Sequence, residues 1–349
     1  MILMALQSSG TISFSNIINE FGQPPGKNLG AYRISENVGG LSNLGLDNND
    51  NLNATIPQSG TIKFSDFYGK KLNVIVNYYS GGTETRPQNG YQRYQANNVR
   101  VLGGFRGRPS NPNGKKVYIH VNKKIRGERE DNIERCSLKT GQSWNGAELR
   151  VDVGGNGKIF GAGGSGGKGH QGGRSDSRAE SGKDGTSALG LTYSAKVKVL
   201  SGGMILGGGG GGGGGGGSRQ EDRRRDRSAG GGGGGGGAGN NEGLGGGIKG
   251  GGGRFRNGER GSNGNEFSSG RGGNGGNNDG EAVGGRGGRG GNHGQPGEAG
   301  EDGRNRGEEY GRGGFGGRGG SAIRVRNASI ISLSNSGTIS GGTGDNGIA

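Results

Sequence analysis

The chain has a single cysteine, Cys136, in 349 residues, so no disulfide can form within it. Proline numbers only 7, aromatic residues make up 5% and apolar residues 25%, so most of the chain cannot build a conventional side-chain core. Collagen is excluded because it needs proline near a fifth of its residues. No stretch approaches the roughly 20 apolar residues of a transmembrane helix, and three scattered histidines with one cysteine exclude a Cys/His zinc module.

Glycine is the abundant residue, with 95 copies, and Lys plus Arg outnumber Asp plus Glu by 44 to 29. The formal charge of +15 indicates anionic partners such as nucleic acid, phosphorylated glycans or a membrane surface. Composition changes near Gly154, after which glycine dominates up to Gly320. We therefore expect a duplicated N-terminal module over 1–72, a β-rich domain over 73–153 and a glycine-rich domain over 154–349.

A direct repeat marks the N-terminal module. SGTISFSNI begins at Ser9, and SGTIKFSDF begins fifty residues later at Ser59. The alternating first half predicts a short strand, and Ser15 or Ser65 is the expected N-cap of a short helix. Two units this small are expected to dock on each other or on a partner protein.

Short β-branched stretches follow at 74–76, 99–102, 116–121 and 149–153, with turn-forming residues between some of them. This pattern predicts a small antiparallel β domain, similar to a sandwich.

A second repeat has the pattern apolar-x-apolar-x-x-x-Gly-x-Ile-x-Gly-x-x-Gly and occurs at 151–164, 197–210 and 331–344. Each copy predicts a hairpin-like strand pair that leads into or closes glycine-rich chain. We expect these three copies to form a β layer that anchors the ends of the glycine segments.

Glycine recurs at every third position in several tracts, among them 258–264, 270–276, 285–303 and 311–320. A polyproline II helix has three residues per turn and no internal hydrogen bonds, so glycine on one side lets a neighbouring backbone approach and bond. The expected fold class is mainly β plus a polyglycine II helix sandwich: small mixed N-terminal modules, a β domain and a distal glycine-rich helix stack. Pure glycine runs should lie in its middle and Gly-x-x runs outside.

RGG triplets support a different function. They begin at Arg271, Arg286, Arg289, Arg312 and Arg318. Such triplets bind RNA through phosphate attraction and stacking, usually in disordered chain. Acidic triplets, such as those with Glu281 and Glu298, are interleaved with them and oppose this interpretation. An RGG-type RNA-binding protein stays an alternative.

The segment SGGMILGGGGGGGGGGG at 201–217, the Gly-x-x tracts and the terminal SNSGTISGGTG at 334–344 resemble the tail-fibre-tip adhesins of T-even-like phages. The resemblance covers most of the chain. The segments SGTISFSNI and SGTIKFSDFYGKK are similar to modules in virion structural proteins of marine T4-like phages.

The resemblance implies an N-terminal attachment part, a distal polyglycine II sandwich and tip loops that bind a host receptor. The implied location is the virion tail. The implied partners are an outer-membrane protein or lipopolysaccharide of the host and other phage tail proteins, with a homotrimer left open and no nucleic acid. A purely structural tail or baseplate component is the alternative within this setting.

Inserts without glycine should loop out where packed helices end. The clearest is SRQEDRRRDRS at 218–228, between the two longest glycine runs. Its arginines could pair with phosphate or carboxylate of a surface polymer, and exposed aromatics could stack on sugars. A solvated charged loop, and aromatics that only cover the edge of the lattice, are the alternatives. The receptor-binding candidates are Arg219, Arg223, Arg224, Arg225, Arg227, Phe255, Phe267 and Tyr310.

The sequence contains only weak indications of an enzyme. Matches to GxGxxG arise from composition alone, and none follows a βαβ pattern. Cys136 and His120 would need a third group and a cleft to act as nucleophile and base. We therefore expect no catalytic site, metal or cofactor.

Overall fold

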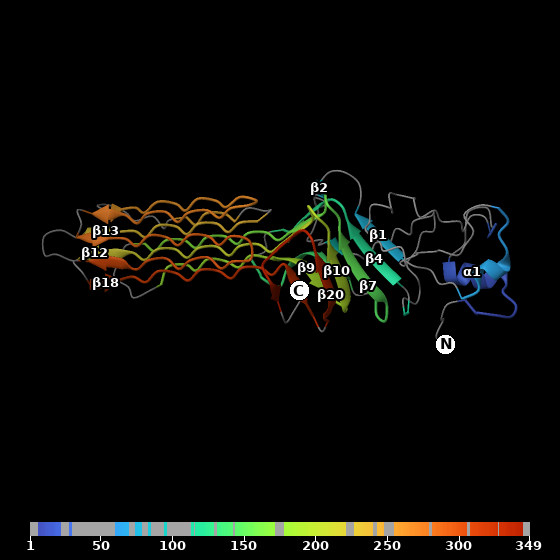
Figure 1. Ribbon diagram of the computed structural model, residues 1–349. Helices are drawn as coiled ribbons and strands as arrows, with labels where there is room; N and C mark the ends of the chain where they lie inside the picture. Colours follow the sequence, from blue (N-terminus) through green and yellow to red (C-terminus); the bar gives the residue numbers. More distant parts are fainter. Residues whose placement is uncertain are drawn as a thin grey trace.

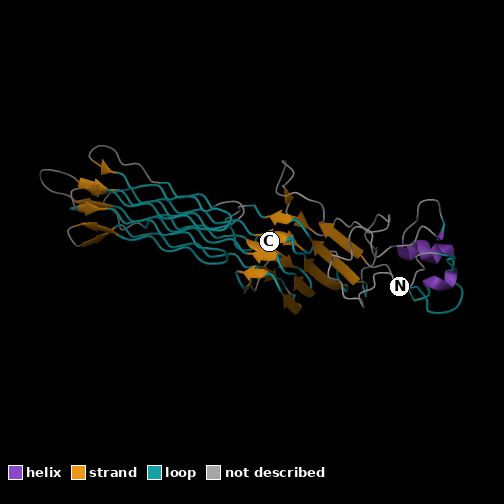
Figure 2. Cartoon of the chain, turned by 45° about the horizontal axis from the view of Figure 1, so that its top comes forward, coloured by secondary structure: helices purple, strands orange, loops and turns teal. Residues whose placement is uncertain are grey.

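Figure 1 shows the computed structural model of the chain, an elongated molecule with helix α1 (Phe14–Phe21) near one end and long extended segments at the other. Short β-strands fill the middle (Figure 2). The structure describes residues 6–21, 28–29, 60–69, 74–78, 83–84, 94–95, 113–114, 116–128, 131–141, 144–171, 178–220, 227–239, 243–247, 255–278, 281–305, 308–326 and 328–344. No helix in these ranges is long and apolar enough to cross a bilayer.

Three sheets of five strands each make up the middle of the molecule, and every strand pair within them is parallel. The first sheet contains β1 (Val74–Tyr78), β4 (Lys116–Val121), β7 (Glu148–Val153), β10 (Ala195–Val199) and β20 (Ile330–Asn335). The second contains β2 (Thr83–Glu84), β5 (Lys124–Arg126), β8 (Lys158–Phe160), β11 (Met204–Leu206) and β21 (Thr338–Ser340). The third contains β3 (Tyr94–Gln95), β6 (Cys136–Lys139), β9 (Ser187–Leu191), β19 (Ile323–Val325) and β22 (Thr343–Gly344).

The chain visits the three sheets in turn, so one strand from each sheet forms one rung of a parallel β-helix. The predicted antiparallel, sandwich-like domain is therefore wrong. The alternation of apolar and polar residues marked the strands but carried no information on their direction. Parallel sheets are usually buried on both faces, and β4 meets this condition, because its described side chains from Val117 to Val121 are all buried.

The three copies of the second repeat lie in adjacent rungs. Ile159, Ile205 and Ile339 are directly opposite one another in β8, β11 and β21. Each copy places its two strands in different sheets, so the predicted hairpin is also wrong. In β20 the pairing is offset from the gap-free alignment by two residues, because Val197 faces Leu333 after a register shift near Ala195.

Apolar side chains inside the rungs form the largest hydrophobic core of the described residues. Core side chains from successive rungs lie directly beside one another, as Leu149 does beside Ala195 and Val151 beside Val197. Trp144, fully buried beside them, donates its indole N–H to the carbonyl oxygen of Thr140 at 2.9 Å. This core holds the strands from which the glycine segments leave.

The two copies of the N-terminal repeat share the same turn. Gly10 and Gly60 both have a positive φ, +92° and +74°, which glycine adopts without strain. Helix α1 and the 3₁₀ turn Phe64–Phe67 follow. In each, the side chain of Asn16 or Asp66 accepts the amide of the residue three positions earlier, at 2.9 and 2.7 Å. The caps therefore lie two residues before the predicted Ser15 and Ser65.

The two copies dock on each other, which is one of the two arrangements expected from the sequence. Ile17 and Phe67 occupy equivalent positions in the repeat, and both are fully buried in one small cluster with Leu6 and Ile12. A backbone bond of 3.1 Å from the Gly69 amide to the Gln7 carbonyl joins the two segments.

Two insertions into the β-helix supply the glycine segments. The first leaves β8 at Gly161 and returns to β9 at Thr186, and the second leaves β11 at Gly207 and returns to β19 through Ala322. Both leave the second sheet and return to the third. The extended segments of these insertions run side by side along the molecule (Figures 1 and 2), and we call them the glycine bundle.

The run 207–217 bonds to a different neighbour at each of three successive amides. Its donors are Gly208, Gly211 and Gly214 to segment 180–186; Gly209, Gly212 and Gly215 to 232–238; and Gly210, Gly213 and Gly216 to 295–301. Its carbonyl groups accept amides from 164–170, 285–291 and 314–320 with the same period of three. This run thus has six bonded neighbours, and the run 230–239 has six as well.

These bonds arrange the described segments in three layers. One outer layer holds 161–171, 178–186 and 243–247. The middle layer holds 311–320, 207–217, 230–239 and 256–265, and the other outer layer holds 295–303, 284–291 and 270–276. The runs 207–217 and 230–239 lie in the centre and are buried throughout, whereas most non-glycine side chains of the other segments are at least partly exposed.

Candidate functional site

Short strands cover the end of the glycine bundle that lies farthest from the β-helix (Figure 1), and we call this end the tip. One tip sheet contains β12 (Ser218–Gln220), β13 (Arg227–Ala229) and β14 (Phe255–Arg256). The other contains β15 (Asn277–Asn278), β16 (Ala282–Val283), β17 (Gly303–Asn305) and β18 (Glu308–Tyr310). The two sheets contact each other, so turns of the bundle that are distant in sequence meet here.

The tip contains four of the eight residues predicted to bind a receptor. Arg219 lies in β12, Arg227 in β13, Phe255 in β14 and Tyr310 in β18. The first three strands are neighbours in one sheet, in which Arg219 is directly opposite Ser228. Residues up to about ninety positions apart in the sequence thereby lie together at the tip.

Arg223, Arg224 and Arg225 lie outside the described residues. The residues that flank them, Gln220 and Arg227, are directly opposite each other in the tip sheet. Their part in binding stays a prediction.

Polar contacts hold the two tip sheets together. The guanidinium group of Arg227 forms an ion pair with Glu281, which precedes β16. The side-chain amide of Asn305 in β17 donates to the Arg219 carbonyl oxygen at 3.1 Å. Ala229 and Ala282 are fully buried under the sheets. Their small side chains let the two sheets approach each other. The positive charge of Arg227 is therefore balanced within the tip.

Phe267 lies at the other end of the bundle, near the β-helix, although it is 58% exposed. Its ring centroid is 6.0 Å from that of Phe160 in β8, in an edge-to-face arrangement. The neighbouring Glu266 forms an ion pair with Lys124 of β5. The structure therefore separates Phe267 from the other candidates and places it at the base of the bundle.

His293 is a structural residue at the same base that the sequence interpretation missed. Its ring nitrogens lie 2.9 Å from the Gly207 carbonyl oxygen and 2.6 Å from that of Glu266. It thereby joins the start of one glycine run to the turn that carries Phe267. The only signal in the sequence is that His293 ends the series of Gly-Gly pairs at 284–291, while every third residue stays glycine.

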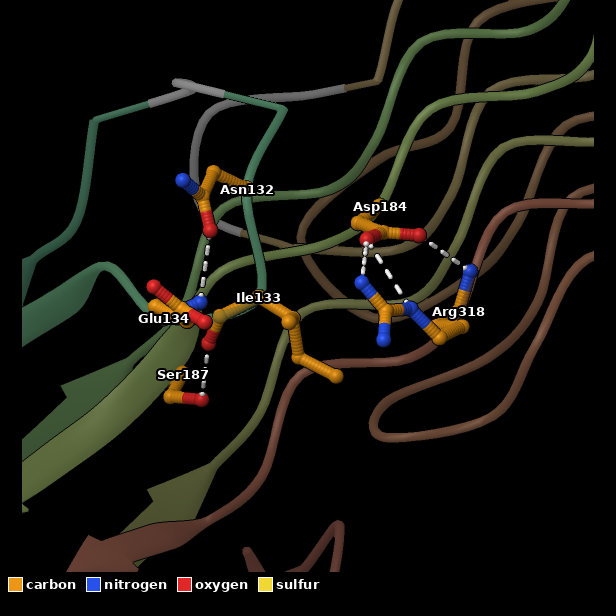
Figure 3. A network of polar contacts seen from close by, with 6 residues as sticks. All are labelled: Asn132, Ile133, Glu134, Asp184, Ser187 and Arg318. Carbon is orange, nitrogen blue, oxygen red and sulfur yellow. Dashed lines mark hydrogen bonds and ion pairs between the residues drawn. The ribbon is translucent and has the colours of Figure 1, made fainter. Parts of the chain in front are cut away.

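Figure 3 shows a polar network at the junction of the bundle and the β-helix. Asp184 accepts the backbone amide of Arg318 at 2.7 Å and binds its guanidinium group at 2.7 and 3.1 Å. Hydrogen bonding to this carboxylate raises the pKa of Arg318 above its ordinary value. Nearby, the Ser187 hydroxyl donates to the Ile133 carbonyl oxygen at 2.7 Å. The first set of contacts joins two bundle segments at their base, and the last joins β9 to the turn before β6.

Side-chain oxygens also accept backbone amides on the outside of the bundle. The amides of Arg286 and Arg289 bond to Glu301 and Glu298, at 3.4 and 3.2 Å. The Arg271 amide bonds to a serine hydroxyl at 2.7 Å. Acidic residues interleaved with the RGG triplets thus complete the bonding of outer segments that have no further backbone neighbour. The triplets are parts of ordered, bonded segments.

The described residues contain no group of three His, Cys, Asp or Glu side chains that could hold a metal ion. Cys136 lies in β6 of the third sheet and His120 in β4 of the first, and the structure does not bring this pair together as a site. Cys136 is buried.

A family model described as "Phage tail fibre adhesin Gp38" matches residues 89–343, which leaves the duplicated N-terminal unit outside the match. No curated protein matches the chain. Among solved structures, the crystal structure of the gp37-gp38 adhesin tip complex of the bacteriophage S16 long tail fibre is similar at 17% identity. The alignment covers 87% of this chain and 95% of that one, with a TM-score of 0.39.

The family match extends over most of the chain, from before β3 into β22, and it includes both insertions of the glycine bundle. The chain belongs to the phage tail fibre adhesin family and is a component of the phage tail.

Proposed function

We propose that this tail adhesin binds the host cell surface through the turns at its tip, which a polyglycine II sandwich holds in place. The observation that carries the proposal is the convergence of β12, β13, β14 and β18 at one end of the molecule, far from α1. This end carries Arg219, Phe255 and Tyr310 and both flanks of the Arg-rich stretch 221–226. Receptors would be an outer-membrane protein or the phosphate and carboxylate groups of lipopolysaccharide.

The bonding period of three supports a polyglycine II conformation for the bundle. Successive amides of one run point to three different neighbours, as expected for a helix with three residues per turn. Crystallography should then give φ and ψ of about −75° and +145° along 207–217. Strand-like dihedral angles with a period of two would contradict this conformation.

Rigid display explains why an adhesin would use such a scaffold. A tip turn whose ends are held by bonded segments loses little conformational entropy on binding, so weak contacts give more affinity. Several copies on one virion would add avidity without any new contact. An adhesin of this kind needs no catalytic group, and we propose none.

Replacing Arg223, Arg224 and Arg225 together with Ser tests the proposal. We expect adsorption of the phage to host cells to slow by at least tenfold, since charge-assisted bonds to the receptor are lost, while the unfolding temperature stays the same. A second variant with Phe255→Ser and Tyr310→Ser should slow adsorption independently.

A matched control removes three positive charges away from the tip, with Lys168→Ser, Lys183→Ser and Arg318→Ser. These side chains are exposed, and adsorption should be unchanged. If neither tip variant affects adsorption, a purely structural role in the tail replaces receptor binding.

The N-terminal unit over 1–72 is the proposed attachment to other phage tail proteins. It has a small core of its own, built around Ile17 and Phe67, and lies outside the residues of the family match. Deletion of 1–72 should abolish incorporation into virions and leave binding of the soluble protein to host cells intact. Light scattering of the full chain would test the homotrimer.

A further inference from the structure

One outer layer of the glycine bundle, formed by 270–276, 284–291 and 295–303, exposes three arginines that the tip does not use. Arg286 and Arg289 each follow a pair of glycines, Arg271 follows Ser269 and Gly270, and all three side chains are exposed. The Gly290 amide bonds to the Gly270 carbonyl and that of Gly287 to Gly273, so these segments are antiparallel. This register places Arg289 directly beside Arg271 and Arg286 beside Asn274.

Within the described residues, the acids of this layer form no ion pair with these arginines. Glu298 and Glu301 lie beside Arg289 and Arg286, as the bonds from their amides to the arginine carbonyl groups show. Their carboxylates, however, accept the backbone amides of those arginines, at 3.2 and 3.4 Å. Within the described part of the chain, the three guanidinium groups have no hydrogen bond or ion pair, whereas Arg227 and Arg318 are paired.

Two unpaired guanidinium groups on adjacent segments repel each other, so an anion between them lowers the free energy of the face. Guanidinium binds phosphate and carboxylate through two parallel hydrogen bonds. Arg286 and Arg289 are one turn apart, about 9 Å along a helix with three residues per turn. The face therefore offers positive charge at fixed intervals on a backbone that is hydrogen-bonded to its neighbours.

We propose that Arg271, Arg286 and Arg289 form a second binding surface, separate from the tip, for the phosphate groups of a cell-envelope polysaccharide that lies along the bundle. The proposal rests on the tail adhesin family and not on the tip turns. A nucleic acid fits this face less well, because single-stranded binding surfaces carry aromatic side chains for base stacking. The sequence from Ser268 to Glu309 contains no Phe, Tyr or Trp.

Binding of the full chain to immobilised inorganic polyphosphate tests the surface directly. The variant with Arg271→Ser, Arg286→Ser and Arg289→Ser should bind at least tenfold more weakly at low salt, with an unchanged unfolding temperature. The matched variant with Lys168→Ser, Lys183→Ser and Arg318→Ser has the same net charge and should stay within twofold of the original. Equal losses in the two variants, or a larger loss in the Arg223, Arg224 and Arg225 variant, would overturn the proposal.

A second pair of substitutions should strengthen binding. Glu298→Gln and Glu301→Gln keep a side-chain oxygen for the arginine amides but remove two negative charges from the face. We expect polyphosphate to bind several-fold more tightly. Unchanged or weaker binding would mean that the arginines are not the anion site.

The source of the phosphate is tested with lipopolysaccharide before and after chemical removal of its phosphates. The original chain should bind the phosphorylated form more tightly than the dephosphorylated form, and the face variant should lose this difference; an equal difference in both chains would overturn the proposal. Single-stranded RNA of equal charge should compete more weakly than polyphosphate, and stronger competition by RNA would overturn the polysaccharide assignment. Loss of adsorption in the tip variant with intact polyphosphate binding would separate this surface from the tip.

Discussion

At the scale of the residue, the centre of the bundle has no room for a side chain. A Cβ atom on Gly213 would overlap the carbonyl oxygen of Gly314 in the next segment, whereas one on Gly247 would meet nothing within 4 Å. Gly213→Ala should therefore lower the free energy of unfolding by about 1–3 kcal/mol or more, because segments must move apart. Thermal unfolding of the two variants measures the difference.

Gly247→Ala is the matched control for Gly213→Ala. Its φ is not in the left-handed region, so alanine should be neutral or stabilise by about 0.4–1 kcal/mol through the unfolded chain. A similar destabilisation by both substitutions would show that glycine is needed here for a reason other than close approach.

His120 makes stability depend on pH. Its side chain is 1% exposed, and neither ring nitrogen has a hydrogen-bond partner within the described residues. Burial disfavours the charged form and lowers its pKa from 6.5 to about 4. As pH falls through this interval, the unfolded chain takes up a proton and the folded chain does not. The free energy of unfolding should thus fall by up to about 3 kcal/mol.

His120→Phe should remove this contribution. Denaturant unfolding at pH 7 and pH 4.5 gives the loss of stability for the original chain and for the variant. The original chain should lose about 2 kcal/mol more than the variant over this range, which stops short of the folded-state pKa. Equal losses would show that His120 is neutral or charged alike in both states.

The sequence predicted the position of some residues in the bundle well and of others not at all. The central position of 207–217 follows from its composition, since only glycine permits neighbours on every side. The location of Phe267 does not follow, because a turn between two Gly-x-x tracts has the same local pattern at either end of the bundle. Whether a turn lies at the base or at the tip depends on how many segments before it run toward the tip and how many run back, and only the structure shows this.

At the scale of the element, the rows of isoleucine in the second sheet allow a graded test. Ile205 lies between Ile159 and Ile339, so it is packed from both sides and fully buried, whereas Ile339 is in the last described rung and only partly buried. Ile205→Ala should cost about 2–5 kcal/mol and Ile339→Ala clearly less. Chemical unfolding measures both, and equal costs would contradict the order of the rungs.

The elements themselves were largely predictable, but their pairing was not. Each apolar-x-apolar stretch marks a strand, and the spacing of Ile159 and Ile205 in equivalent repeats indicates equivalent places in a fold. Whether equivalent strands pair in parallel or form hairpins depends on the path that the chain takes between them. Here the connection between equivalent strands passes through two other sheets, so parallel stacking resulted.

At the scale of the whole molecule, the glycine bundle is an addition to a continuous β-helix. Its insertions close at their bases: the Thr186 amide bonds to the Ala162 carbonyl at 2.9 Å, and the Gly320 amide to the Gly208 carbonyl at 2.7 Å. Replacing 163–185 and 209–319 each with two glycines should therefore leave a folded β-helix. Circular dichroism should show one cooperative unfolding transition.

This shortened chain also separates the two proposed activities of the protein. It should still enter virions through the N-terminal unit and should lose both adsorption and polyphosphate binding. An unfolded product would show that the β-helix depends on the bundle, contrary to the prediction.

The direction of the bundle segments has a mechanical consequence. They run along the long axis, and each is bonded to its neighbours over its whole length. Tension between the tip and the β-helix would load these bonds in shear, many at once, rather than peel them open one by one. For a virion tethered at its tip and dragged by flow, the adhesive contact should therefore fail before the lattice yields.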